Sequence, residues 1–438
     1  MTRSQRIPTT ALAATLALAL VAAAQPALAA NTATKFGDPV PVADGVTFDP
    51  ILDARLRWED VDQPTTALKT ADAVTMRVRA GFELKDAPTH LSFLAEAAGN
   101  LAIDDHYNAF PYALTGSQRR PQYATVADPN NIALNRLQLQ YRTANLGLTV
   151  GRQRINLDDE RWVGSVGWRQ NEQTFNAVRG EAKFGPVSLD ATYADRQNTI
   201  YGNDGGPRVG YDGQFWFLTG GIKTGPVMTR GFAYLLDYDP TSFAFQNNSS
   251  QTYGFRSTGS LKLLPKLKLN FAGSFARQSA YKDNPTRFAA TYGAAEAGLG
   301  LANLTVKAGY ELLGADTRAL SATGAITTIA MQTPMATLHK FDGWADLFLT
   351  TPAKGLQDSY AGVAYRFAEV KAVPGLNAQV TYHQYGSDIG SLRYGHETDA
   401  SVGFKTGPIS WLVKYADYVA RGFGVNTRKF WLQAEFSL

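Results

Sequence analysis

The sequence contains no cysteine, and charged residues make up only 18% of it. Without cysteine the chain can form neither a disulfide framework nor a zinc–thiolate site, and it has no thiol for redox catalysis. Its formal net charge is +4, with both signs spread along the chain, which does not indicate a nucleic-acid surface. Beyond the N-terminal region no apolar run is long enough for a transmembrane helix. If the mature chain enters a membrane, it must therefore do so with β-strands.

The N-terminus has the three zones of a secretory signal peptide. Arg3 and Arg6 form a basic start, the apolar run 11–24 is too short to span a bilayer, and small residues precede a cleavage site near Ala29. This order of zones predicts export through the Sec pathway. The predicted divisions are a signal peptide (1–29), a periplasmic N-terminal segment (30–50) and an outer-membrane barrel (51–438).

From about residue 50 onward, apolar and polar residues alternate with the period of two that is typical of β-strands. Segment 52–59 (LDARLRWE) places its apolar residues on one face and its Asp, Arg and Glu residues on the other, and segment 73–84 repeats the pattern. A soluble sandwich also alternates. It would not usually carry so many segments of at least the ~9–11 residues that a tilted strand needs to cross a bilayer.

The connections between these segments alternate between short turns and long loops. Eight short turns, most of them punctuated by Pro or Gly, and nine longer polar stretches join eighteen predicted strands. Segment 341–349 (FDGWADLFL) is interpreted as loop, since counting it as a strand would break the even number that bacterial barrels have. The sequence thus predicts an all-β, antiparallel, up-and-down transmembrane barrel of about 18 strands, a monomer with both ends on the periplasmic, short-turn side.

The last segment, 428–438, puts Phe430, Phe436 and Leu438 on one face. This resembles the C-terminal assembly signal of outer-membrane barrels, in which the final residue is usually Phe or Trp rather than Leu. We therefore expect the outer-membrane assembly machinery, the lipid bilayer and lipopolysaccharide to be partners of the chain.

If the apolar face meets lipid, the charged face lines a wet lumen, since Arg or Lys on the lipid side costs about 2–4 kcal/mol near the midplane. Guanidinium groups pair with carboxylates through two hydrogen bonds and stay charged at any pH, so an Arg-lined lumen favours anions. The alternative is that lumen charges pair with one another and merely keep the interior wet. This alternative is weaker for Arg77 and Arg79 together with Arg55 and Arg57, where cations outnumber local acids. The inward-facing candidates for substrate binding are Arg55, Arg57, Arg77, Arg79, Arg136, Arg179, Glu181 and Lys183, and Arg196 is assigned to the same face.

Segment 146–153 does not fit the simple alternation. Arg152 falls on the same face as Leu148 and Val150, which would direct it toward lipid. A β-bulge at Gly151 would turn Arg152 inward, as bulges do near barrel rims. We adopt this interpretation and count Arg152 among the substrate-binding candidates.

Segment 154–173 connects a rising strand to a falling one, so it is either an extracellular loop or a constriction folded into the barrel. Trp162 and Trp168 are either membrane-interface anchors or platforms that stack on sugar rings. In the second case Arg161 and Arg169 hold uronate carboxylates. Arg154, Trp168 and Arg169 are counted in the candidate site.

Two further features stay open. Asp158, Asp159 and Glu160 offer oxygen ligands to calcium, but without the spacing of a known loop, so no metal site is predicted. The long aromatic loop 100–131 is either a lid over the mouth or a mobile surface loop.

No enzyme or cofactor is predicted. None of the five histidines lies in a nucleophile or zinc signature, and His383 and His396 flank one hairpin, where solvated rim histidines are common. A TonB-dependent transporter is not expected either, because no plug-like domain precedes the first strand.

Two stretches, 150–180 and 336–367, resemble the most recognisable parts of the alginate-export family of bacterial outer-membrane porins. The family's Gly-Arg-Gln falls on residues 151–153 and its Trp-Arg on residues 168–169. The resemblance implies an eighteen-stranded barrel with an Arg-lined passage for an anionic polysaccharide, and a periplasmic scaffold as a possible partner. The alternative function is selective uptake of small organic anions such as sugar acids or aromatic carboxylates.

Overall fold

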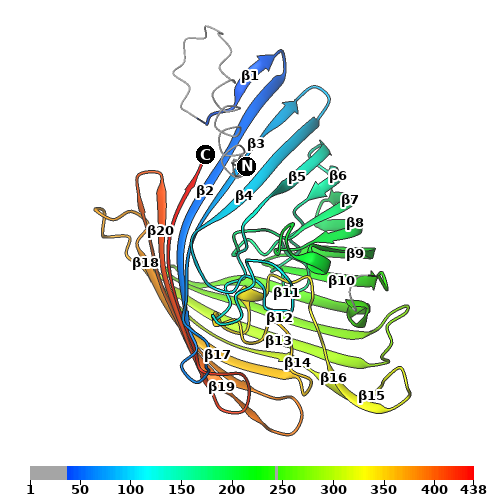
Figure 1. The fold of residues 1–438 in the computed structure, drawn as a ribbon. Coiled ribbons are helices and arrows are strands. Elements are labelled where there is room, and N and C mark those ends of the chain that lie inside the picture. Colours follow the sequence, from blue (N-terminus) through cyan, green and yellow to red (C-terminus); the bar gives the residue numbers. More distant parts are fainter. Residues whose placement is uncertain (1–36, 242–244) are drawn as a thin grey trace, which may run out of the picture.

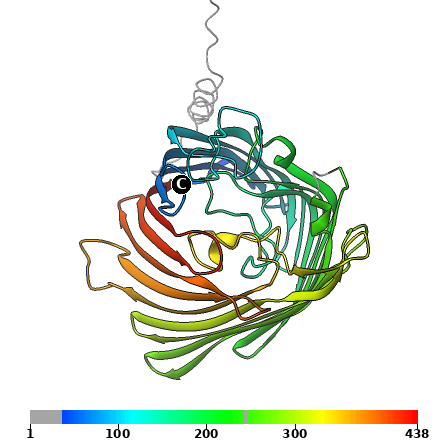
Figure 2. The same cartoon turned by 60° about the horizontal axis from the view of Figure 1, so that its bottom comes forward.

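The computed structural model describes residues 37–241 and 245–438, so the predicted signal peptide lies outside the described residues. Eighteen antiparallel strands close into one barrel (Figures 1 and 2), which confirms the predicted fold class. Their bounds are β2 Val46–Asp62, β3 Ala71–Asp86, β4 Leu91–His106, β5 Asn131–Arg142, β6 Leu146–Gln153, β7 Thr174–Phe184, β8 Val187–Asn198, β9 Gly210–Thr224, β10 Val227–Tyr238, β11 Ser250–Leu264, β12 Leu267–Ala280, β13 Ala289–Leu301, β14 Leu304–Leu313, β17 Leu356–Arg366, β18 Asn377–Gly386, β19 Arg393–Thr406, β20 Ile409–Ala420 and β21 Thr427–Ser437.

Barrel strands that follow one another along the chain are paired, and the last strand, β21, pairs with β2 to close the sheet. A short strand β1, Val40–Ala43, adds to β2, which itself begins at Val46, before the predicted barrel start at residue 51. Three 3₁₀ helices complete the regular structure of the described residues: η1 Gly206–Arg208, η2 Phe245–Asn248 and η3 Leu338–Lys340. Within those residues, no helix has the length and apolar character needed to cross a membrane.

The strands point their apolar side chains outward and their charged ones inward. On β2, Leu56 and Trp58 are 46% and 38% exposed, whereas the alternating residues Arg57 and Glu59 are each 1% exposed. This is the reverse of a water-soluble protein, and it is the arrangement that a strand requires when one face meets lipid and the other a polar interior.

The short turns gather at one end of the barrel, which we call the short-turn end, and the long loops at the other. Segment 341–349 lies in a loop, as predicted, between β14 and β17. The same loop contains a hairpin that the sequence analysis missed, β15 Ala315–Leu320 and β16 Ile326–Ala330. The loop after β4 begins at Tyr107, later than the predicted residue 100.

Two long segments fold back into the barrel, where Figure 2 shows them crossing the interior. We call residues 154–173 the first inner loop and residues 331–355 the second inner loop. A parallel bridge between Val163 and Met335 joins them. Of the two alternatives for segment 154–173, the constriction folded into the barrel is therefore the correct one.

The inner loops are held by an apolar core that lies inside the barrel. Fully buried aromatic residues of the wall, such as Phe217, Tyr418 and Trp431, pack with Val163 and Phe348 of the inner loops. The hydrophobic effect therefore stabilises the two loops against the wall in addition to their polar contacts.

The bulge predicted at Gly151 is absent. Strand β6 keeps an unbroken register with β5 up to Arg152 and with β7 up to Gln153, so Arg152 stays opposite Leu137, which is 41% exposed on the outer face. There the Arg152 guanidinium donates to the Asn176 side chain and to the carbonyl of Leu134. The inward placement of Arg152 was wrong because a positive φ at the glycine was accommodated without a register shift.

Arg196, also assigned to the inner face, lies outside for the opposite reason. Strand β8 does contain an irregularity between Ala194 and Arg196, and this places Arg196 beside Asn176 on the outer face, where it pairs with Asp212.

Candidate substrate passage

Four arginines form a compact row on the inner face of β2 and β3. Strand register sets Arg55 directly opposite Arg77, with Arg57 and Arg79 one step further along their strands. All four are at most 8% exposed. The predicted cluster of Arg55, Arg57, Arg77 and Arg79 is thus brought together by the barrel wall.

Carboxylates from distant parts of the chain partly neutralise this row. Arg55 and Arg77 share Glu435 of the last strand, with N–O distances of 2.9 Å each, and Arg77 also pairs with Asp53. The expectation that cations outnumber acids here was wrong for this half of the row, because Glu435 reaches it only through barrel closure.

The other half of the row takes its carboxylates from loops. Arg79 lies 2.8 Å from Glu172 of the first inner loop, and Arg57 lies 3.7 Å from Asp128, which the loop between β4 and β5 delivers into the interior. Even so, four buried nitrogens of the row have neither a hydrogen bond nor an ion pair within the described residues: Arg55 Nε, Arg77 Nε, Arg77 Nη1 and Arg79 Nε.

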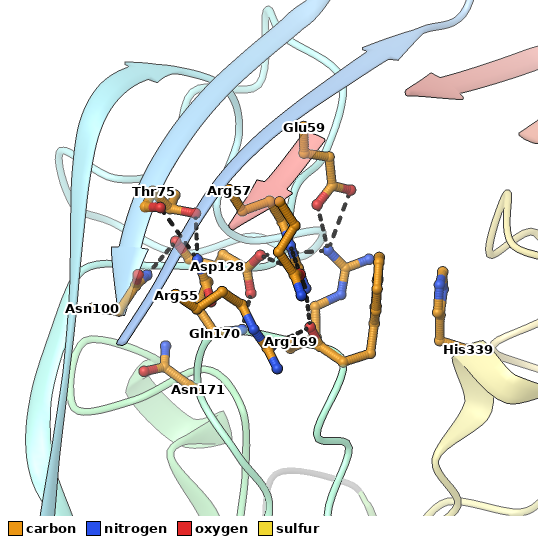
Figure 3. A network of polar contacts seen from close by, with 12 residues as sticks. Arg55, Arg57, Glu59, Thr75, Asn100, Asp128, Arg169, Gln170, Asn171 and His339 are labelled. Carbon is orange, nitrogen blue, oxygen red and sulfur yellow. Dashed lines mark hydrogen bonds and ion pairs between the residues drawn. The ribbon is translucent and has the colours of Figure 1, made fainter. Parts of the chain in front are cut away.

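Two arginines of the row, Arg55 and Arg57, also dock the first inner loop (Figure 3). Arg57 donates to the carbonyl oxygen of Trp168 at 2.7 Å, and Arg55 donates to that of Gly167 at 3.1 Å. Gln170 of the loop donates to the hydroxyl of Thr75 at 2.8 Å. Main-chain carbonyls therefore accept some of the donors that an anionic substrate would otherwise use.

Trp168 lies inside the barrel, so its interpretation as a membrane-interface anchor was wrong. Its ring stacks on His339 of the second inner loop at 4.5 Å, and the Arg57 guanidinium and Lys414 ammonium lie 4.0 and 4.1 Å from it. These three groups cover the indole, and a sugar could stack on it only by displacing one of them. Trp162 is also internal, packed near Phe232.

Asp346 of the second inner loop is the hub of the contacts between the loops. It accepts the Nδ1–H of His339 at 2.7 Å and pairs with Arg169 of the first inner loop at 2.9 Å and with Lys429 of the wall at 2.7 Å. Burial opposes its charge, but His339, Lys429 and Arg169 outweigh that effect and hold the pKa of Asp346 well below its ordinary value.

His339 completes the connection to the wall. Burial lowers the pKa of His339 well below its ordinary value, so the imidazole is neutral. With Nδ1–H donated to Asp346, its Nε2 accepts the Lys414 ammonium at 2.7 Å.

The wall that receives the second inner loop, on β14 and β17 to β19, is rich in carboxyl groups, which the sequence analysis did not single out. Arg161 of the first inner loop lies 2.6 Å from Glu311 and 3.0 Å from Asp342. Burial and the neighbouring Glu311 raise the pKa of Asp342 well above its ordinary value. Buried carboxyl groups of this wall are Glu311, Asp358, Glu397 and Asp399. The recurrence of acids at alternate positions, as in residues 397–399, was the available signal.

Arg136 and Arg154, two further predicted residues, meet at Glu96. Arg136 lies 2.7 Å from this carboxylate and Arg154 lies 3.2 Å from it, and Arg154 also pairs with Glu172 at 2.5 Å. Through Glu172 they are continuous with the arginine row.

Arg179, Glu181 and Lys183 lie apart from this network. They line a cavity of about 430 Å³ at the short-turn end, below the start of the first inner loop.

The acidic triplet of the first inner loop is paired with cationic side chains and a hydroxyl group of the protein. Asp158 pairs with Arg230 at 2.8 Å, Asp159 with Arg256 at 3.1 Å, and Glu160 accepts the hydroxyl of Thr337 and pairs with Lys340. In the part of the chain that the structure describes, no group of three or more His, Asp or Glu side chains is arranged to hold a metal ion.

Several proteins of known structure have a similar fold. Barrels of similar fold include Pseudomonas aeruginosa OccK1 (OpdK), with 13% identity, a TM-score of 0.66, and coverage of 89% of this chain and 98% of that one. The structure of P. aeruginosa OpdK with vanillate has 13% identity and a TM-score of 0.67, and the match covers 89% of this chain and 98% of that one. Acinetobacter baumannii OccAB3 has 14% identity and a TM-score of 0.65, and the match covers 89% of this chain and 99% of that one. At these identities the likeness shows the fold alone.

None of the curated proteins compared with the chain matches it. Residues 51–195 match the sequence model of the alginate export family. This match includes the predicted family stretch 150–180, whereas the stretch 336–367 lies beyond it. The chain is therefore a β-barrel with the fold of these proteins, and its residues 51–195 match the alginate export family, the family that its sequence resembles.

Proposed function

We propose that the protein is an outer-membrane porin that conducts acidic carbohydrates, uronate oligosaccharides or an alginate-like polymer, through its arginine- and lysine-lined lumen. The porin fold and the family match support transport rather than catalysis and a location in the outer membrane. The observation that carries the anionic substrate is the row of four buried arginines with four nitrogens that lack any partner in the described residues.

The carboxylates that already lie against this row suit transport. A substrate carboxylate reaching Arg77 must compete with Asp53 and Glu435, and one reaching Arg79 must compete with Glu172. Competition of this kind weakens each site, and conduction requires several weak sites, because an anion that binds too tightly does not leave.

A second candidate is selective uptake of small organic anions. Both inner loops are fixed to the wall by buried ion pairs, and a polymer would have to displace more of those contacts than a single small acid. The similar barrel of OpdK was solved with vanillate, a small aromatic acid, in the crystal.

Planar-bilayer recordings test the proposal. In a salt gradient the purified barrel should show an anion-selective reversal potential, and uronate polymers added to one chamber should block the current. A cation-selective channel would contradict the proposal. Block by small carboxylates with no block by polymers would favour the second candidate.

We also propose that the chain is exported by the Sec pathway and inserted by the outer-membrane assembly machinery as a monomer in contact with lipopolysaccharide. The alternating apolar face of β21 supports this, with Leu432 40% exposed beside the fully buried Trp431. A periplasmic scaffold would meet the short-turn end.

A further inference from the structure

The cavity of about 430 Å³ at the short-turn end is separate from the arginine row. It is bounded by the turn 142–147, by residues 156–158 of the first inner loop, and by inward side chains of β7, β8, β9 and β10. Its volume falls within the range of small-molecule sites, roughly 300–1,000 Å³. The inner loop is its far boundary, so a molecule in this cavity has not yet passed the constriction.

The charges around the cavity leave one cation uncompensated. Arg142 pairs with Glu181 at 2.7 Å and Arg179 with Asp190 at 2.5 Å. Arg230 pairs with Asp158 of the inner loop, as described above. Lys183 has no ion pair within the described residues and is exposed to the cavity. Its ammonium is thus available to a ligand carboxylate, and a lysine is a mobile point charge on a flexible stem.

Gly147 leaves space in the cavity beside the ion pair of Arg142 and Glu181. A Cβ on Gly147 would lie 3.2 Å from Oε2 of Glu181 and 3.4 Å from Cζ of Arg142. These distances are tight for a methyl group, so any larger residue here would occupy the space beside the ion pair.

The remaining lining is suited to hydroxyl groups and unsuited to an aromatic ring. Asn156, Ser188 and Thr219 offer side-chain donors and acceptors, and Glu181 and Asp190 can accept O–H groups. No Phe, Tyr or Trp is among the residues that line this cavity, whereas aromatic ligands are usually held by apolar and aromatic walls.

We propose that this cavity is a binding site for a single hydroxylated carboxylate, a sugar acid of the hexuronate class, at the short-turn mouth of the lumen. The carboxylate is held by Lys183 and the exposed edge of Arg142, and the hydroxyls donate to Glu181 and Asp190. The site rests on the proposed anion passage and narrows its substrate to hydroxylated rather than aromatic acids. A ligand in the bath should reach this site from the short-turn side, because the first inner loop separates the cavity from the opposite mouth of the barrel.

The test is single-channel recording of the full-length mature barrel inserted in one orientation, with glucuronate or benzoate added to either chamber. Glucuronate should block from the short-turn side at lower concentration than from the other side, and benzoate should block weakly from both. Lys183→Gln should raise the blocking concentration of short-turn-side glucuronate roughly tenfold, the loss of one charge-assisted contact. Gly147→Val should do the same by filling the cavity.

The matched control is Lys268→Gln, which removes another inward lysine near the short-turn end, outside the cavity. It should leave the blocking concentration unchanged. Equal effects of Lys183→Gln and Lys268→Gln, or benzoate block as strong as glucuronate block, would overturn the site while anion selectivity remained. A wild-type channel with no anion preference would overturn the proposed function and this site together.

Discussion

The indole of Trp168 and the imidazole of His339 lie parallel, with 4.5 Å between their centroids and 5° between their planes. Trp168 belongs to the first inner loop and His339 to the second, so this contact joins two loops that leave the barrel wall on different sides. Together with the pairing of Arg169 and Asp346, it makes the two loops one body inside the lumen.

Replacing Trp168 by alanine should loosen that body. The change removes the stack on His339 and the cation–π contacts with Arg57 and Lys414, each of the latter being worth about 0.5–2 kcal/mol. We expect larger mean conductance and more frequent current fluctuations. Trp411→Ala, at the short-turn end of β20, is the matched control and should behave as the wild type.

Acidification should also release the second inner loop. When the loop undocks, His339 enters water and its pKa returns to roughly 6.5, whereas docked His339 stays neutral well below that pH. The undocked state then binds a proton that the docked state does not, so docking weakens as pH falls below about 6.5. Asp346, whose pKa is depressed by its partners, keeps its contribution until pH falls below about 3.9.

Current fluctuations measured between about pH 7 and pH 5 cover the pH range in which undocked His339 titrates. They should increase in the wild type as pH falls. In His339→Gln the level of fluctuation should no longer depend on pH, and a persistent dependence would assign the effect to another group.

Asp346→Asn should undock the second inner loop at neutral pH. It leaves Lys429 buried without a carboxylate and Arg169 with Glu59 and Asp128 only, and breaking a buried pair in this way costs about 3–5 kcal/mol. Trypsin should then cleave after Lys340 faster than in the wild type. Asp239→Asn, in an exposed loop, should leave the cleavage rate unchanged.

Arg77→Glu combined with Arg79→Glu should lower the anion preference of the channel. The two substitutions reverse the charge of half of the arginine row and add carboxylates beside Asp53 and Glu435. A smaller reversal potential in a salt gradient is the expected result. An unchanged potential would show that the current does not pass this row.

Arg152→Gln should leave the reversal potential unchanged, because Arg152 lies on the outer face beside Leu137. It removes the same type of side chain from the outer face of the barrel, and it is therefore the matched control for Arg77 and Arg79. A drop in anion preference in this variant would contradict its outward placement.

The barrel itself could be predicted because each strand carries its own evidence. Alternation such as Leu56, Arg57, Trp58 and Glu59 is a local property that lipid on one side and polar groups on the other impose directly. Arg152 supports the same rule. The simple alternation placed its side chain correctly on the outer face, and the bulge that was assumed in order to turn it inward did not form.

The interior could be predicted only in part, because its contacts join residues that are distant in sequence. The sequence showed that Arg55 and Arg77 face inward, but not that Glu435 would reach both after barrel closure. Nor could the sequence show that Trp168 would contact His339, because the two residues lie in different loops. Each of these loops folds inward because its apolar residues pack against the core inside the barrel.

The pairing of β2 with β21 has a consequence for biogenesis. The sheet has two unsatisfied edges until its final strand arrives, so no intermediate made from part of the chain can seal itself. Glu435, carried on that final strand, also reaches Arg55 and Arg77 only then. Barrel closure and the pairing of Arg55 and Arg77 with Glu435 therefore occur in the same step. A chain that lacked β21 would lose both the closed sheet and these ion pairs.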